Sequence, residues 1–177
     1  MSGTTAPLLG FERMEQLGSA SSYLDEIFSV VKSLMLFEDF TVVEYTKLCE
    51  YMMCFGALRG DTILQEGTEG NFMMVVLTGQ VDVLKNDATG NKKLVARVGP
   101  GSFLGEMSLI DGQKRFASCV ATQPTDFAVL TRDMLNMIMV DYPHLANKVL
   151  LLVLQLMTSR LRDATTRMLP TIVCESI

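Results

Sequence analysis

A carboxylate, several glycines and an arginine occur close together in the segment from Gly99 to Thr122. Glu106 directly follows Gly105, and Arg115 lies nine residues after Glu106. Glycine lets the backbone approach a ligand closely, and a short helical turn beginning near Gly105 would point free N–H groups at an anion. Arginine offers phosphate oxygens a planar, permanently charged set of donors, and a carboxylate accepts from a hydroxyl. Together these groups suit a phosphate that is fused to a ribose.

This segment lies within a series of short β-prone runs between about residues 55 and 130. Glycine-rich turns separate the runs, for example at Thr78-Gly79 and Gly99-Pro100-Gly101. Several short antiparallel strands with tight turns predict a β-barrel or jelly roll. The predicted strands are Thr62–Gln65, Phe72–Leu77, Gln80–Lys85, Lys93–Val98, Ser118–Thr122 and Phe127–Leu130.

Helical patterns precede the β-prone region. Residues 1 to about 20 are small, polar and loosely patterned, which predicts a flexible arm or a short helix. Apolar residues recur at helical spacing from Ser22 to Phe37. Thr41 and Glu44 have the spacing of a capping box and predict a helix that continues to about Met53.

Helical patterns also follow the β-prone region. Thr131 can cap a short helix that ends at about Val140, and Pro143 suits the first turn of a long helix running to about Met168. The predicted fold class is therefore α+β, with an antiparallel β-barrel or jelly roll between N-terminal helices and a long C-terminal helix.

Length and charge limit the classes of function. The 177 residues suit one domain, or one domain with a helical extension. The net charge of -5 provides no basic surface for nucleic acid, and the only grouped arginines are Arg160, Arg162 and Arg167. We therefore expect no direct contact with nucleic acid.

The cysteines and the single histidine do not indicate a metal or a nucleophilic enzyme. The four cysteines lack metal-ligand spacing and are interpreted as small buried side chains of a reducing compartment, and His144 has no partner pattern. The first ten residues do not resemble a signal peptide, and the most apolar stretch, Val149–Met157, is nine residues long. These features predict a cytoplasmic protein that does not enter a membrane.

Two stretches of the chain resemble a known ligand-binding motif. Phe103–Ile110 and Arg115–Ala121 are similar to the phosphate-binding cassette of the cyclic-nucleotide-binding domain superfamily, which includes bacterial cAMP receptor proteins and regulatory subunits of cAMP-dependent protein kinase. The likeness continues upstream at Gly60–Gly67 and Phe72–Val83 and downstream through the long helix, so it covers roughly residues 35 to 165.

The resemblance implies a role for individual cassette residues. Glu106 would accept from the ribose 2′-hydroxyl, and Arg115 would pair with the exocyclic oxygens of the cyclic phosphate. The backbone amides of Gly105, Ser108 and Phe116 would complete the anion site.

Other positions complete the predicted ligand-binding set. Met107 and Ala117 belong to it as members of the same cassette. In the family the long helix covers the base, so Thr165 or Thr166 is the expected base contact. Phe116 departs from the family, which usually has Ala, Ser or Thr after the arginine. Because a threonine there is associated with cGMP preference in the family, Phe116 counts against cGMP and also leaves open a reshaped pocket.

The helix predicted over Leu145–Leu161 carries apolar side chains on nearly all faces between residues 149 and 157. A helix packed on one neighbour needs only one apolar stripe. The family dimerises along this helix, so we predict a homodimer through residues 145–161.

The predicted organisation has four parts: an arm and helix over 1–40, the cyclic-nucleotide-binding β-barrel over 41–142, the long helix over 143–169 and a tail over 170–177. The chain is predicted to be a cyclic nucleotide receptor, with cAMP as the expected ligand, and not an enzyme. Binding would change its conformation and signal to a protein partner. The residues after the long helix are too few for a DNA-reading unit. The alternatives are a degenerate fold that serves as an interaction or dimerisation module, and a sensor of another small ligand.

Overall fold

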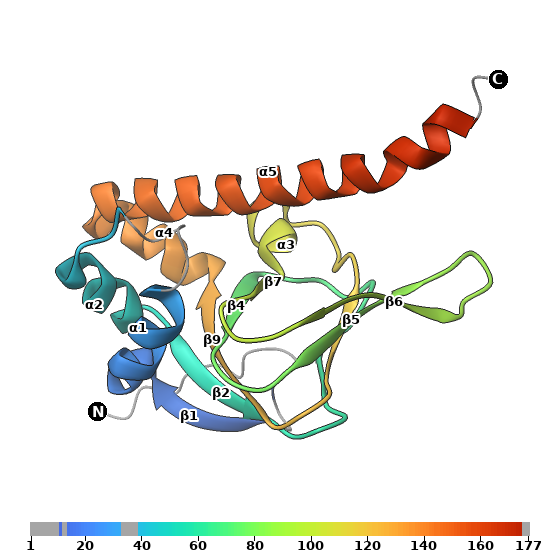
Figure 1. Ribbon diagram of the computed structural model, residues 1–177. Helices are drawn as coiled ribbons and strands as arrows, with labels where there is room; N and C mark the ends of the chain where they lie inside the picture. The colour runs from blue at the N-terminus through green and yellow to red at the C-terminus, as the bar shows by residue number, and fades with distance from the viewer. Residues whose placement is uncertain (1–10, 12–13, 33–38, 175–177) are drawn as a thin grey trace.

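Two antiparallel sheets form the centre of the structure, a computed structural model that describes residues 11, 14–32 and 39–174 (Figure 1). The first sheet has the strand order β1-β2-β9-β4-β7 and the second has the order β3-β8-β5-β6. The strands are β1 (Glu15–Ser19), β2 (Met53–Ala57), β3 (Thr62–Leu64), β4 (Phe72–Val76), β5 (Val81–Asn86), β6 (Lys92–Val98), β7 (Phe103–Leu104), β8 (Ser118–Ala121) and β9 (Thr125–Thr131).

This arrangement confirms the α+β class and the jelly-roll fold, but the alternative of a barrel was wrong. Within the described residues each strand pairs only with strands of its own sheet, so the two sheets face each other without closing. The sequence pattern could not distinguish the two forms because both bury alternate side chains of each strand.

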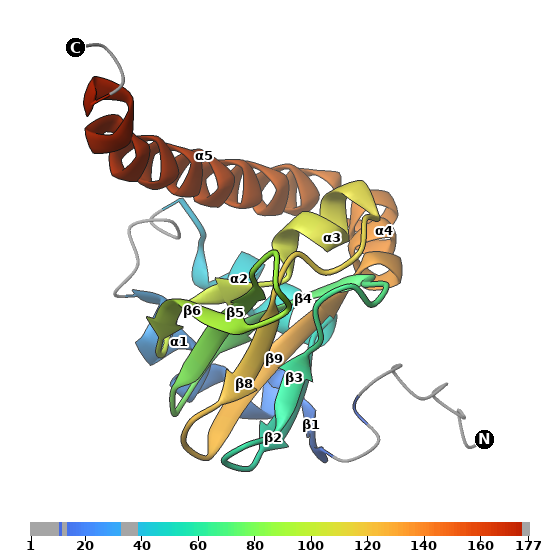
Figure 2. The same ribbon diagram turned by 90° about the vertical axis from the view of Figure 1, so that its right-hand side faces the viewer.

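The helices lie on one side of the sheets, and α5 is the longest. They are η1 (Ala20–Tyr23), α1 (Leu24–Lys32), α2 (Val42–Glu50), α3 (Glu106–Asp111), α4 (Arg132–Asp141) and α5 (Pro143–Cys174). Figure 2 shows α5 lying over α3 and α4, with its C-terminal end projecting beyond the sheets. The helix continues to Cys174, beyond residue 169, where it was expected to end.

The predicted helix starts are confirmed. The Thr41 side chain accepts from the Glu44 amide while the Glu44 carboxylate accepts from the Thr41 amide. Thr131 caps α4 by accepting from the amide of Met134. Helix α2 ends at Glu50, before the predicted limit, because Met53 already pairs with β9 as the first residue of β2.

The N-terminal region differs from the expectation of a flexible arm or short helix. Residues 15–19 form β1, which pairs antiparallel with β2, and Phe11 is buried with its ring 4.8 Å from that of Phe55. The rest of the predicted arm, residues 1–10, 12 and 13, lies outside the described part of the chain. No local pattern predicted β1 because the strand is stabilised by partners far away in the sequence.

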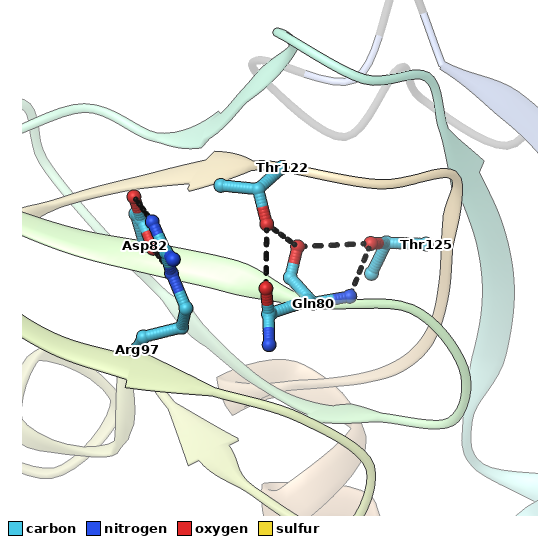
Figure 3. Close-up of polar contacts among 5 residues, drawn as sticks. All are labelled: Gln80, Asp82, Arg97, Thr122 and Thr125. Atoms are coloured by element: carbon cyan, nitrogen blue, oxygen red, sulfur yellow. Dashed lines mark hydrogen bonds and ion pairs between the residues drawn. The ribbon is translucent and has the colours of Figure 1, made fainter.

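Polar contacts secure β5, a strand that carries part of the site. Thr122 donates to the Gln80 carbonyl at 3.1 Å, and the Gln80 amide donates to Thr125 Oγ1 at 3.2 Å (Figure 3). Further along β5, Asp82 accepts two hydrogen bonds from Arg97 on β6. These contacts hold β5 between β8 and β6.

Two apolar clusters form the core. One fills the space between the sheets, and the other lies beneath the helices and receives Val149, Leu152 and Val153 of α5. The core therefore fixes the first half of α5 against the sheets. No helix in the described part of the chain is long and apolar enough to cross a membrane.

Candidate functional site

A hollow beside α3 contains most of the residues singled out from the sequence. Its empty volume is about 410 Å³, including the open mouth. Seven of the nine predicted ligand-binding residues line it: Gly105, Glu106, Met107, Ser108, Arg115, Phe116 and Ala117. The rest of the lining consists of Leu64, Val83, Leu104, Cys119 and Arg160. The structure thus brings the two parts of the cassette together around one cavity.

Arg115 is buried and only partly satisfied. Its Nη1 donates to the carbonyl oxygens of Phe72 at 2.8 Å and Gly105 at 2.9 Å, and its guanidinium lies 4.2 Å from the centre of the Phe72 ring. Its Nη2 is buried without a partner. Burial lowers the pKa of Arg115 to about 10, so the group still carries its charge at neutral pH. A buried donor of this kind requires an acceptor.

Glu106 is the first residue of α3, and its side chain is almost completely buried. Its Oε1 accepts from Arg160 on α5, and the same arginine also donates to the carbonyl oxygen of Phe103. Its Oε2 is buried without a partner. One carboxylate oxygen therefore joins α3 to α5, while the other remains available to a donor.

Two glycines make room for the Arg115 side chain. A Cβ at Gly70 would lie 2.3 Å from Arg115 Nε, and a Cβ at Gly105 would lie 2.5 Å from Arg115 Nη1. Gly105 also has a φ of 80°, which side chains disfavour. Glycine is therefore needed at both positions for steric reasons.

Main-chain and side-chain contacts hold the two halves of the cassette in place. The Arg115 amide donates to the carbonyl of Thr68 at 2.7 Å, and the amide of Gly67 donates to the Arg115 carbonyl at 2.9 Å. Arg132, at the start of α4, donates to two carbonyls of α3, those of Ser108 and Leu109. Both halves are thus fixed by parts of the chain outside the cassette.

Thr165 and Thr166 do not reach the hollow in this structure. Both are exposed on α5, beyond Arg160, and their hydroxyls donate to carbonyls of their own helix. Their contact with a base stays a prediction.

Two residues that position Glu106 and Arg115 were not assigned to the site from the sequence. Arg160 was noticed only as a member of a small basic group, and Gly70 was not noticed at all. Helical periodicity could have placed Arg160 on α5, but only the packing of α5 over α3 brings it to Glu106. The need for glycine at position 70 depends on Arg115, which is far away in the sequence.

The hollow thus combines a cationic donor and a carboxylate acceptor, both buried and each with one atom unpartnered. This arrangement suits a small ligand with an anionic group and a hydroxyl group. The described residues contain no group of three or more His, Cys, Asp or Glu side chains that could hold a metal ion.

Comparisons with known proteins agree with this geometry. Residues 57–142 match the model of the cyclic nucleotide-binding domain. The crystal structure of a cyclic nucleotide-binding domain from Methylobacillus flagellatus KT is 45% identical, with a TM-score of 0.82 and coverage of 89% of each chain. The chain belongs to the cyclic nucleotide-binding domain family.

More distant relatives are regulatory proteins. The cyclic AMP receptor protein of Thermus thermophilus is 35% identical over 75 residues, which are 42% of this chain and 35% of the relative. A cAMP-dependent protein kinase regulatory subunit of Yarrowia lipolytica is 34% identical over 85 residues, 48% of this chain and 21% of the relative. The match thus spans 35% of the first and 21% of the second of these longer proteins.

Proposed function

We propose that this cyclic nucleotide-binding domain is a receptor for a cyclic nucleotide monophosphate, with cAMP as its ligand, and that it acts by binding and not by catalysis. One observation carries the proposal: Arg115 Nη2 and Glu106 Oε2 are both buried, both unpartnered and both at the same hollow. The relatives named for cAMP support the choice of nucleotide.

In the proposed complex, Arg115 Nη2 donates to an exocyclic phosphate oxygen and Glu106 Oε2 accepts from the ribose 2′-hydroxyl. Glu106 Oε1 can keep its ion pair with Arg160 while this happens. Glu106 would then contact both the ligand and Arg160 of α5, so that ligand binding could change the position of α5. A partner protein would detect that change.

Titration calorimetry with cAMP, cGMP and cyclic dinucleotides tests the proposal. We expect saturable binding of cAMP at micromolar concentration or tighter. Arg115→Gln should weaken binding by about 1.5–3 kcal/mol, because a charge-assisted hydrogen bond is lost. Arg97→Gln is the matched control, since Arg97 pairs with Asp82 on the β5–β6 hairpin and does not line the hollow.

If no cyclic nucleotide gives a heat of binding, the proposed receptor function is wrong. That result would favour the alternative that this fold serves as a protein-interaction module. Two features support that second candidate. Phe116 places a large ring at the mouth of the hollow, and Arg160 already occupies one oxygen of Glu106.

We also propose that α5 mediates a homodimer. Leu151, Leu154, Leu161 and Met168 are 57%, 60%, 68% and 61% exposed, and their spacings of three, seven and seven residues place them in one stripe. Pairing of two such stripes would remove them from water.

Light scattering at micromolar concentration tests the dimer. The wild type should have twice the mass of the chain, and the double variant Leu154→Glu/Leu161→Glu should be a monomer. Leu94→Glu, an exposed leucine on β6, is the control and should remain a dimer. A monomeric wild type would rule out this assembly.

A further inference from the structure

Phe116 is an exposed aromatic residue at the mouth of the hollow, directly after Arg115. Its side chain is 58% exposed, although it lines the cavity. Leaving a ring of this size in water loses the free energy of burial that a core position would provide. The contacts of Phe116 show what holds the ring in place.

Lys85 binds Phe116 through both its main chain and its ring. The Lys85 Nζ donates to the Phe116 carbonyl oxygen at 2.7 Å and lies 4.4 Å from the centre of the ring. A cation at this distance is attracted by the face of the ring. Because one ammonium makes both contacts, Lys85 fixes the ring relative to the backbone beside Arg115.

Lys85 is itself held from a second direction. Glu66 Oε1 accepts from Lys85 Nζ at 2.6 Å, and Glu66 Oε2 accepts from the amide of Asn86 at 2.9 Å. The Glu66 amide donates to the buried hydroxyl of Ser118 at 3.0 Å. Lys85 is therefore fixed between the loop after β3 and the start of β8.

Lys85 also lies at the rim of the hollow. Residues two apart on a strand share one face, and Val83 of β5 lines the cavity. Lys85 follows Val83 by two positions on the same strand, and its Nζ reaches the ring of Phe116, which lines the cavity. The ring and its cation together form one fixed wall of the mouth.

We propose that Phe116 is the surface on which the base of the nucleotide stacks, and that Lys85 is a positioning residue that holds this ring. The inference rests on the proposed function, in which Arg115 and Glu106 bind the phosphate and the ribose. The base then lies against the apolar part of the lining, which includes Phe116, Leu64, Val83 and Met107. Since a larger ring stacks over more area, this wall favours purine over pyrimidine nucleotides.

Titration calorimetry with three ligands separates the base from the rest of the nucleotide. The ligands are cAMP, cCMP and ribose 3′,5′-cyclic phosphate, which lacks a base. Phe116→Leu should lower the affinity for cAMP by about tenfold and the affinity for cCMP by less. It should leave the affinity for the base-free ligand unchanged. Phe116→Tyr keeps the ring and should keep the affinity for cAMP.

Lys85 is tested with the same ligands. Lys85→Met should lower the affinity for cAMP by about threefold and leave the affinity for the base-free ligand unchanged. Lys85→Arg, which keeps the positive charge, should keep the wild-type affinity for cAMP. The double variant Phe116→Leu/Lys85→Met should be no weaker than Phe116→Leu alone, because Lys85 acts through the ring. Lys93→Met, an exposed lysine on β6, is the control.

Three results would overturn the inference. If Lys85→Met lowers the affinity for the base-free ligand as much as the affinity for cAMP, Lys85 attracts the phosphate by its charge and does not act through Phe116. If Phe116→Leu leaves the affinity for cAMP unchanged, the base does not stack on the ring, and the receptor function itself survives. If the wild type binds none of the three ligands, the inference and the proposed function are both wrong.

Discussion

At the scale of single residues, the site is defined by polar atoms that the fold buries without satisfying. The fold orients Arg115 through two backbone carbonyls and Glu106 through Arg160, and it leaves one atom of each unpartnered. Such burial is costly in the absence of a partner. In the proposed complex, a ligand that supplies an acceptor and a hydroxyl donor would remove that cost, and both groups would already be oriented before it binds.

Gly70 provides a steric test of this arrangement. A Cβ at this position would meet Arg115 Nε at 2.3 Å, so Gly70→Ala should displace the guanidinium and weaken cAMP binding by about tenfold or more, roughly the effect of losing a charge-assisted hydrogen bond. Gly99→Ala is the matched control, because a Cβ there would meet nothing closer than 3.8 Å. Equal affinities for the two variants in calorimetry would contradict the assigned role of Gly70.

At the scale of elements, a side-chain pair joins α5 to α2. Lys148 of α5 donates to the Glu44 carboxylate at 2.7 Å and to the carbonyl oxygen of Asp39 at 2.7 Å. The hydrogen bond from Lys148, followed by that from the Thr41 amide, lowers the pKa of Glu44 from 4.5 to about 2. The carboxylate that completes the capping box of α2 thus also anchors α5.

This pair predicts a pH dependence of stability. Because folding lowers the pKa of Glu44, its contribution is complete above pH 4.5 and is lost as the pH falls towards 2. Glu44→Gln keeps the capping pattern but loses the ion pair, and should cost roughly 0.5 kcal/mol at neutral pH. In urea denaturation the difference between wild type and variant should disappear over the same pH range.

The control for Glu44 lies on the same helix. Glu50 forms its ion pair with Lys47 of the same helix and not with α5. Glu50→Gln should therefore change the stability less than Glu44→Gln does. An undiminished difference between wild type and Glu44→Gln at pH 2 would show that the ion pair with Lys148 contributes nothing.

At the scale of the whole molecule, Glu106 is the junction between the hollow and α5. The first half of α5 is packed on the core, whereas residues 160–168 are exposed, and the Arg160–Glu106 ion pair holds this part of the helix to α3. A ligand on the free oxygen of Glu106 would stabilise α3 and, through Arg160, the exposed half of α5. Binding would then be transmitted to the far end of the molecule.

Hydrogen exchange measures this coupling directly. At about a hundredfold excess over Kd, cAMP should slow the exchange of amides in α3 and of α5 near Arg160 by up to about a hundredfold. In Arg160→Met the slowing should persist in α3 and vanish in α5. Arg162→Met, two residues further along the same helix, should behave as the wild type does; loss of the α5 effect in both variants would argue against a specific role of Arg160.

Local patterns were sufficient for most of the secondary structure and for seven residues of the site. Helix starts at Thr41 and Thr131 depend on side chains within three residues, and the strands of the jelly roll depend on alternation and turns. The cassette from Gly105 to Ala117 could be predicted because its two halves are close together in the chain. Such features depend on neighbours in the sequence; the structure confirms the helix starts and the jelly-roll strands, and it places the seven cassette residues around one hollow.

The segment around Glu106 and Arg115 thus carried its chemistry in the sequence alone: a carboxylate, an arginine and the glycine before the helix. Only the tertiary structure shows that a side chain at Gly70 would clash with Arg115. It alone also shows the contact of Arg160 with Glu106 and that of Lys85 with Phe116. It also decided that β1 joins the first sheet and that the sheets stay open. Each of these depends on residues far apart in the chain, whose contacts form only when the sheets and α5 pack together, and no local spacing records them.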